Sequence, residues 1–121
     1  MKTRNFDLRP TGTQMEYRNM YFADVYHVCV GLWHIGYYFE DNFSGKNWYA
    51  FSVLEKDFYK YEELVKSLNS SNTCFGEDCI YTHGLYAAEC ITAAIMDNFH
   101  PYPTLEDAVS GEGVRRCCMN L

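Results

Sequence analysis

The stretch from Thr13 to Phe39, TQMEYRNMYFADVYHVCVGLWHIGYYF, decides the fold, because a helix and extended strands compete for it. Thr13 and Glu16 have the spacing of a capping box, which is typical of a helix N-terminus. Valines and two glycines after residue 25 favour extended structure instead. We expect a helix from residue 13 to about residue 36, with its second half open to either structure. The apolar side chains that follow a helical spacing are Tyr17, Tyr21, Val25, Val28, Leu32, Ile35 and Phe39.

Next along the chain, residues 41–47 (DNFSGKN) have the composition of a turn. They lead into residues 48–53 (WYAFSV), whose aromatic and β-branched side chains predict a strand. Residues 58–61 fit a second short strand, but the apolar spacing that continues to Leu68 fits a helix equally well. A further short strand is expected around residues 79–81.

The clearest helix is predicted at residues 83–98, where apolar and small side chains share one face. Thr82 is the expected N-cap of this helix. The sequence HPYP at 100–103 ends it, and Thr104 is placed to cap a last short helix. The sequence therefore predicts an α+β fold. It is expected to be a single compact domain with a long N-terminal helix, a small antiparallel sheet and a central alanine-containing helix.

The 121 residues match the usual size of one domain, and charge divides them into three parts. We expect a basic N-terminal arm (1–12), one α+β domain (13–114) and a basic C-terminal tail (115–121). Residues 21–114 hold fourteen acidic and four basic side chains, within a formal net charge of −6 for the whole chain. Such a body repels nucleic acid and favours basic protein partners, so direct nucleic-acid binding is not expected.

The most apolar stretch, residues 25–39, is too short and too interrupted to span a bilayer, and no signal peptide precedes it. We therefore expect no membrane association and a cytoplasmic location. In that reducing compartment the six cysteines should be free thiols.

Candidate chemistry is sparse. Cys74 and Cys79, with His83, are weak candidates for zinc, because their spacing departs from the usual paired ligands. His83 and Cys90 lie two helical turns apart, too far for the pairing that activates a thiol. The sequence therefore predicts no catalytic residues and no cofactor.

Residues 44–51 (SGKNWYAF), followed by Phe58 and Tyr59, resemble the middle of the ArdB/KlcA antirestriction family. Gly76-Glu77, and then Gly84, Leu85 and Ala87 opening a helix, extend the likeness over roughly residues 31–95. The sequence departs from the family at Lys56-Asp57, where the family has a glycine pair, and after Phe99. The resemblance implies an α+β protein of a plasmid, phage or other mobile element. Such a protein shields incoming DNA from type I restriction without being an enzyme.

The expected function is thus that of a non-enzymatic acidic inhibitor, with a host defence protein such as a restriction enzyme as its partner. Two alternatives stay open: an immunity protein against a toxin, and a small Cys/His metal-binding or thiol enzyme. The oligomeric state is left open. Because binding residues concentrate on loops and their flanks, the expected partner-binding residues are Asp41, Phe43, Trp48, Tyr49, Glu77, Asp78 and Tyr81.

Overall fold

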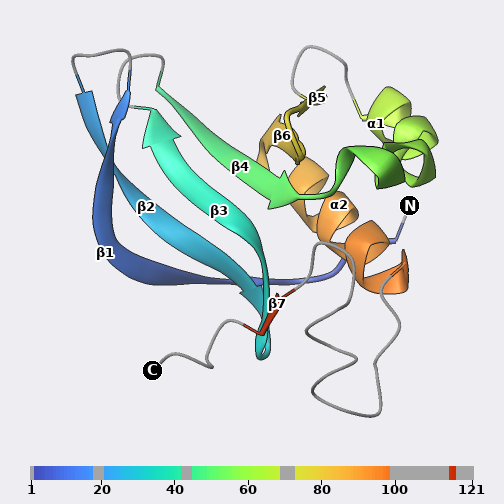
Figure 1. Ribbon diagram of the computed structural model, residues 1–121, viewed down its shortest axis with the longest axis horizontal. Helices are drawn as coiled ribbons and strands as arrows, with labels where there is room; N and C mark the ends of the chain where they lie inside the picture. Colours follow the sequence, from blue (N-terminus) through green and yellow to red (C-terminus); the bar gives the residue numbers. More distant parts are fainter. Residues whose placement is uncertain (1, 18–20, 42–44, 69–72, 99–114, 117–121) are drawn as a thin grey trace.

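The computed structural model (Figure 1) describes residues 2–17, 21–41, 45–68, 73–98 and 115–116. Their strands form one antiparallel sheet in the order β1-β2-β3-β4-β6-β5, and β7 pairs with the start of β3. No described helix has the length and apolar character needed to cross a bilayer. The strands are β1 (Asp7–Tyr17), β2 (Tyr21–Val30), β3 (Trp33–Asp41), β4 (Lys46–Ser52), β5 (Thr73–Gly76), β6 (Cys79–His83) and β7 (Arg115–Arg116). The helices are η1 (Glu55–Lys60, 3-10), α1 (Glu62–Ser67) and α2 (Leu85–Asn98).

The predicted fold is wrong in its main element, because strands replace the long N-terminal helix. The capping-box residues Thr13 and Glu16 lie inside β1, and the rest of the predicted helix forms β2 and the start of β3. Gly31 has a φ of +59°, which lets the chain turn back so that Val30 pairs with Trp33. Instead of a small sheet beside a long helix, a sheet of seven strands dominates the molecule.

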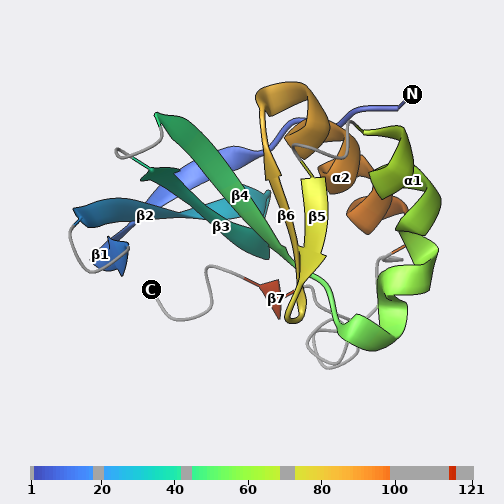
Figure 2. The same ribbon diagram turned by 90° about the horizontal axis from the view of Figure 1, so that it is seen from above.

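One face of this sheet, which we call the core face, packs against the helices. Along β4 its residues alternate with outward-pointing neighbours, as the period of a strand requires. Ile91 of α2 is fully buried in the same cluster, and Val65 places α1 there as well. Figure 2 shows α2 beside β6, with α1 next to it. The buried strand residues of the cluster are Val28, Ile35, Tyr38, Tyr49, Phe51 and Ile80.

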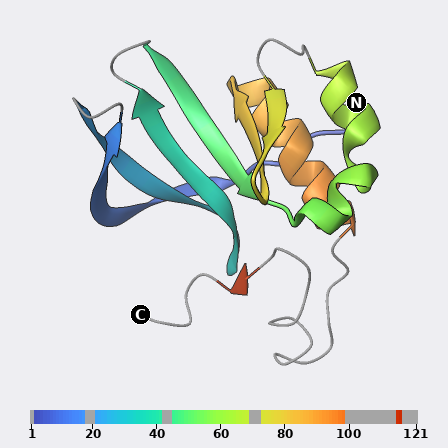
Figure 3. The ribbon, with the colours of Figure 1, turned by 45° about the horizontal axis from the view of Figure 1, so that its top comes forward.

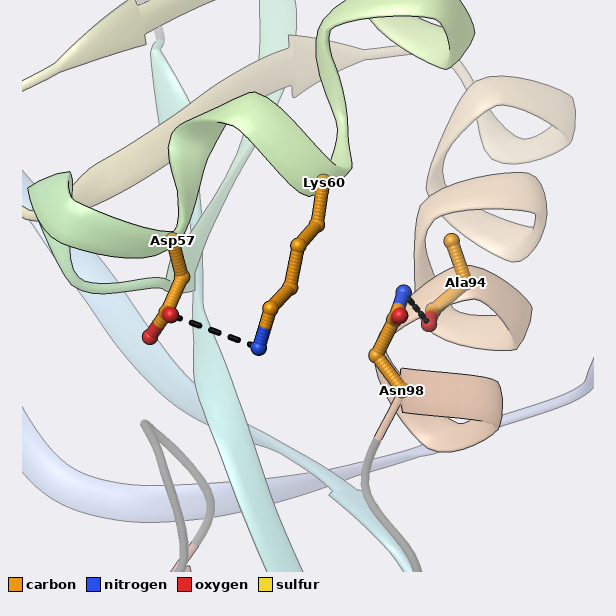
Figure 4. A network of polar contacts seen from close by, with 4 residues as sticks. All are labelled: Asp57, Lys60, Ala94 and Asn98. Atoms are coloured by element: carbon orange, nitrogen blue, oxygen red, sulfur yellow. Dashed lines mark hydrogen bonds and ion pairs between the residues drawn. The ribbon is translucent and has the colours of Figure 1, made fainter.

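Between β4 and β5, η1 and α1 follow one another, so the short strand considered for residues 58–61 is absent and its helical alternative is confirmed. Asp57 is buried, with only 10% of its side chain exposed. It forms an ion pair of 3.4 Å with the Lys60 ammonium, one turn further along η1 (Figure 4). In the same view, the Asn98 amide donates to the Ala94 carbonyl in the last turn of α2.

The strands predicted at 48–53 and around 79–81, and the helix predicted at 83–98, correspond to β4, β6 and α2. The N-cap predicted for this helix is wrong. Thr82 belongs to β6, is fully buried, and shares a 2.8 Å hydrogen bond with the Thr73 hydroxyl. Gly84, with a φ of +102°, separates strand from helix, and its carbonyl accepts from the Ala88 N–H. The last helix expected from Thr104 lies outside the described residues.

The N-terminal segment contacts the body of the domain (Figure 3). The Arg4 N–H donates to the Glu89 carbonyl of α2 over 3.2 Å. The Phe6 ring meets the Tyr49 ring edge-on, with centroids 5.4 Å apart. β1 begins at Asp7, inside the segment predicted as an arm.

Three tyrosine rings, those of Tyr26, Tyr38 and Tyr49, pack in a row on the core face, with successive centroids 5.7 and 4.9 Å apart. Burial, aided by the Glu40 carboxylate, raises the pKa of Tyr38 from 10.0 to about 12. The folded state therefore holds this proton more tightly than the unfolded chain does. The resulting stabilisation is complete below pH 10 and disappears as the pH rises toward 12.

We expect the urea midpoint of unfolding to fall as the pH is raised above about 10, and to fall less in Tyr38→Phe, which has no phenolic proton. The difference should be partial, because burial also raises the pKa of Tyr49. Identical alkaline slopes for the two proteins would show that Tyr38 does not contribute.

Candidate functional site

The other face of the sheet, the outer face, is left uncovered by the described helices. Strand pairing places its side chains in two neighbouring rows. Phe39 pairs with Trp48, and Trp48 with His83. In the next row Ala50 lies between Tyr37 and Tyr81, and Tyr81 pairs with Cys74. The core residues Tyr38, Tyr49, Phe51 and Ile80 occupy the alternate positions between them on β3, β4 and β6. Aromatic rings from three strands therefore share one outward-facing surface.

A cavity of about 240 Å³ opens among these rings, lined by Phe39, Trp48, Cys74 and Tyr81. We call it the aromatic pocket. The His83 ring stands edge-on to the Trp48 ring, with centroids 5.0 Å apart. Tyr37, in the row of Ala50, is 41% exposed. The small side chain of Ala50 lies between the larger side chains of Tyr37 and Tyr81 on the neighbouring strands.

Gly76 sets the position of the Tyr81 ring. A Cβ added at Gly76 would lie 2.8 Å from Cδ2 of Tyr81 and closer still to Cε2, so the ring lies directly across the glycine. The Tyr81 hydroxyl and the Cys79 sulfur interact with each other along β6. Burial, together with the Cys79 thiol, raises the pKa of Tyr81. The ring that forms one wall of the pocket is thus held by both its face and its hydroxyl.

The turn between β5 and β6 is acidic, and we refer to its residues Glu77 and Asp78 as the acidic turn. Asp78 adopts a positive φ of 49°, and its carbonyl accepts from the Val53 N–H over 3.1 Å. Its carboxylate accepts from the Glu55 N–H over 3.3 Å. Glu77 is exposed, and its charge adds to the raised pKa of Tyr81. Negative charge therefore lies beside the Tyr81 side of the aromatic pocket.

Three of the four histidines also lie on this side of the sheet. The rings of His27 and His34 are 4.8 Å apart, and the Tyr37 ring is 5.5 and 4.7 Å from them. His34 and Tyr37 line a second cavity of about 360 Å³, which reaches Asp78 and Cys79. Burial, with the nearby Lys46 ammonium, lowers the pKa of His83. A neutral imidazole is therefore favoured beside Trp48.

The structure brings part of the predicted site together. Trp48 and Tyr81 both line the aromatic pocket, and Glu77 and Asp78 form the turn beside it. Tyr49 is 7% exposed and points to the core face, because adjacent residues of a strand point to opposite faces. We therefore leave it out of the candidate surface. The backbone of Asp41 ends β3, but its side chain, like all of Phe43, lies outside what the structure describes.

Two residues of the pocket were missed as binding residues. The sequence places Phe39 on a helical face and offers Cys74 only as a metal ligand or a reactive thiol. The alternation of half-buried and buried side chains around Trp48 identifies the outer face of β4. Only the pairing of β3 with β4 and of β5 with β6 adds Phe39 and Cys74 to it. That pairing is non-local and is not visible in the sequence.

Cys74, Cys79 and His83 do not form a metal site. Among the residues that the structure describes, no group of three or more His, Cys, Asp or Glu side chains is placed to hold an ion. Cys74 pairs with Tyr81, Cys79 pairs with Gly76, and the His83 ring packs on Trp48. Burial raises the pKa of the Cys79 thiol, the reverse of what a nucleophilic cysteine needs. The four described cysteines are free, as expected: Cys29, Cys74, Cys79 and Cys90.

Comparison with known proteins adds no assignment. No protein-family model matches the chain, and no curated protein or solved structure does so either. The ArdB/KlcA resemblance thus stays a prediction from the residues between 31 and 95. A functional proposal has to rest on the chemistry of the outer face.

Proposed function

We propose that this protein is a non-catalytic inhibitor from a mobile element or phage, which acts in the cytoplasm by binding a basic surface of a host defence protein. A type I restriction enzyme is the first partner to test. The observation that carries the proposal is the aromatic pocket on the outer face with the acidic turn beside it. Aromatic side chains are enriched in protein interfaces, where each buries a large area at a small cost in side-chain entropy.

The charge of the chain supports a basic partner. Residues 21–114 carry fourteen acidic and four basic side chains, so this span has a formal charge of −10. A DNA-handling enzyme needs a positively charged surface for the phosphate backbone. An acidic protein is attracted to such a surface and excludes DNA from it by occupying it. This mode of inhibition needs no bond to be made or broken.

The construction of the outer face also suits binding. The pocket side chains come from β3, β4, β5 and β6, so adjacent hydrogen-bonded strands hold them instead of a long loop. Strand-borne side chains keep their relative positions when a partner approaches, which lowers the entropy cost of association.

Plating of unmodified phage tests the proposal. Cells with a type I restriction system should yield more plaques when they express this protein than when they carry an empty vector. A host lacking the restriction system serves as the control and should show no difference. Equal plating with and without the protein, across several type I systems, would remove restriction as the target.

A further inference from the structure

We propose that the aromatic pocket binds one arginine side chain of the basic partner. This inference rests on the proposed function for the identity of the partner, whereas the chemistry of the pocket can be tested by itself. Three observations favour arginine as the occupant of the pocket: the size of the pocket, the aromatic rings in its wall, and the distribution of charge around it.

The size of the pocket fits a single side chain. Its volume of about 240 Å³ lies below the range of roughly 300–1,000 Å³ typical of small-molecule and cofactor sites. The wall offers three aromatic rings and a thiol, and it comes from four strands. An amino-acid side chain presented by a partner's surface can fill such a pocket.

The chemistry of the wall matches arginine in two ways. The apolar stem of an arginine packs on aromatic carbon while its charged end stays accessible. The planar guanidinium stacks on the faces of Trp, Tyr and Phe rings, and tryptophan gives the strongest cation–π attraction of the three. Trp48, Tyr81 and Phe39 supply all three ring types.

The charges around the pocket are unevenly distributed, so they favour one orientation of a bound guanidinium. On the Tyr81 side lies Glu77, whose carboxylate is near enough to raise the pKa of the Tyr81 phenol. At the opposite end of β6 from the acidic turn lies His83, where burial and the nearby Lys46 ammonium lower the imidazole pKa. A bound guanidinium is therefore drawn toward Tyr81 and the acidic turn and away from Lys46. An uncharged anchor such as leucine would gain nothing from Glu77.

The test uses blocked tripeptides with a central arginine or a central norleucine, whose uncharged chain has a similar apolar stem. Binding is followed through the indole N–H resonance of Trp48 in a ¹H–¹⁵N spectrum, with Trp33→Phe used for assignment. The arginine peptide should shift this resonance and bind roughly three- to fivefold more tightly than the norleucine peptide, as expected for an exposed cation–π contact. Equal affinity for the two peptides, or no shift with either, would overturn the proposal.

Two variants locate the contact. Cys74 is exposed on the edge strand β5, so Cys74→Phe fills the pocket mouth without altering the core. Lys66→Phe adds the same ring at an exposed position of α1, outside the pocket, and is its matched control. Cys74→Phe should abolish arginine-peptide binding, whereas Lys66→Phe should keep it. Glu77→Gln should weaken the arginine peptide selectively, and Glu63→Gln, an exposed acid on α1, should have no effect.

The two proposals can fail separately. If phage protection is present but the peptides do not bind, the arginine pocket is wrong and the inhibitory function stands. If the arginine peptide binds but protection is absent from every restricting host, the pocket stands and the antirestriction role is wrong. Should Cys74→Phe fail to fold, the unchanged affinity of Glu77→Gln for the arginine peptide would contradict the proposal by itself.

Discussion

Replacing Gly36 with alanine is expected to lower the free energy of unfolding by about 3 kcal/mol. Gly36 lies in β3, where it pairs with both Val28 and Phe51. A Cβ at this position would overlap the carbonyl oxygen of Ala50 and lie 2.9 Å from the Cα of Phe51. Both are backbone atoms of β4, so no rotation of a side chain can relieve the overlap. Urea unfolding followed by tryptophan fluorescence measures the loss.

Gly45→Ala is the control for this experiment. Gly45 has a φ of +74°, but no heavy atom lies within 4 Å of the position a Cβ would take. Its substitution should cost about 1 to 2 kcal/mol through backbone strain alone. If Gly36→Ala proved no more harmful than Gly45→Ala, the close approach of β3 and β4 would be in error.

Phe51→Ala should cost about 3 to 5 kcal/mol, the usual cost of truncating a buried phenylalanine. Phe51 is fully buried in the core cluster, where its ring is stacked at 6.1 Å from that of Tyr49. Its removal would leave a cavity between the sheet and the helices. The urea midpoint of the purified variant measures the effect.

Ser52→Ala, one residue further along β4, provides the comparison, because its side chain belongs to the outer face. This change should alter the free energy of unfolding by less than about 0.5 kcal/mol. Equal losses at Phe51 and Ser52 would contradict the assignment of the two faces.

The sequence predicted well those elements whose signal is local. The run of aromatic and β-branched residues at 48–53 marks β4, and the small and apolar face at 83–98 marks α2. Even for α2, the N-cap predicted from the sequence is wrong. Thr82 has the side chain of an N-cap, yet burial against Thr73 in the sheet outweighs that local preference.

The N-terminal half was mispredicted because its residues satisfy two patterns at once. Val28 and Ile35 recur at helical spacing, and both are also fully buried in the sheet. Gly31, one of the two glycines that favour extended structure in the sequence, forms the turn between β2 and β3. Pairing between strands decided the outcome, and no window of local sequence contains that information.

The candidate site was predicted for Trp48, Glu77 and Tyr81, which stand near loops and have side chains suited to binding. Tyr49 shows the limit of that reasoning, because it differs from Trp48 only in the parity of its position on the strand. Once β4 is recognised, alternation assigns one of the two to the core. The contribution of Phe39 and Cys74 to the aromatic pocket depends on the order of the strands in the sheet. Alternation along a single strand does not reveal that order.

Phage plating with Cys74→Phe and its control Lys66→Phe tests most directly the claim that the outer face performs the function. On a host with a type I restriction system, Lys66→Phe should protect unmodified phage as well as the unchanged protein does. Cys74→Phe, at equal expression and with an unchanged unfolding midpoint, should lose most of that protection. Full protection by Cys74→Phe would contradict the claim, because a protein whose aromatic pocket is filled could not then depend on it.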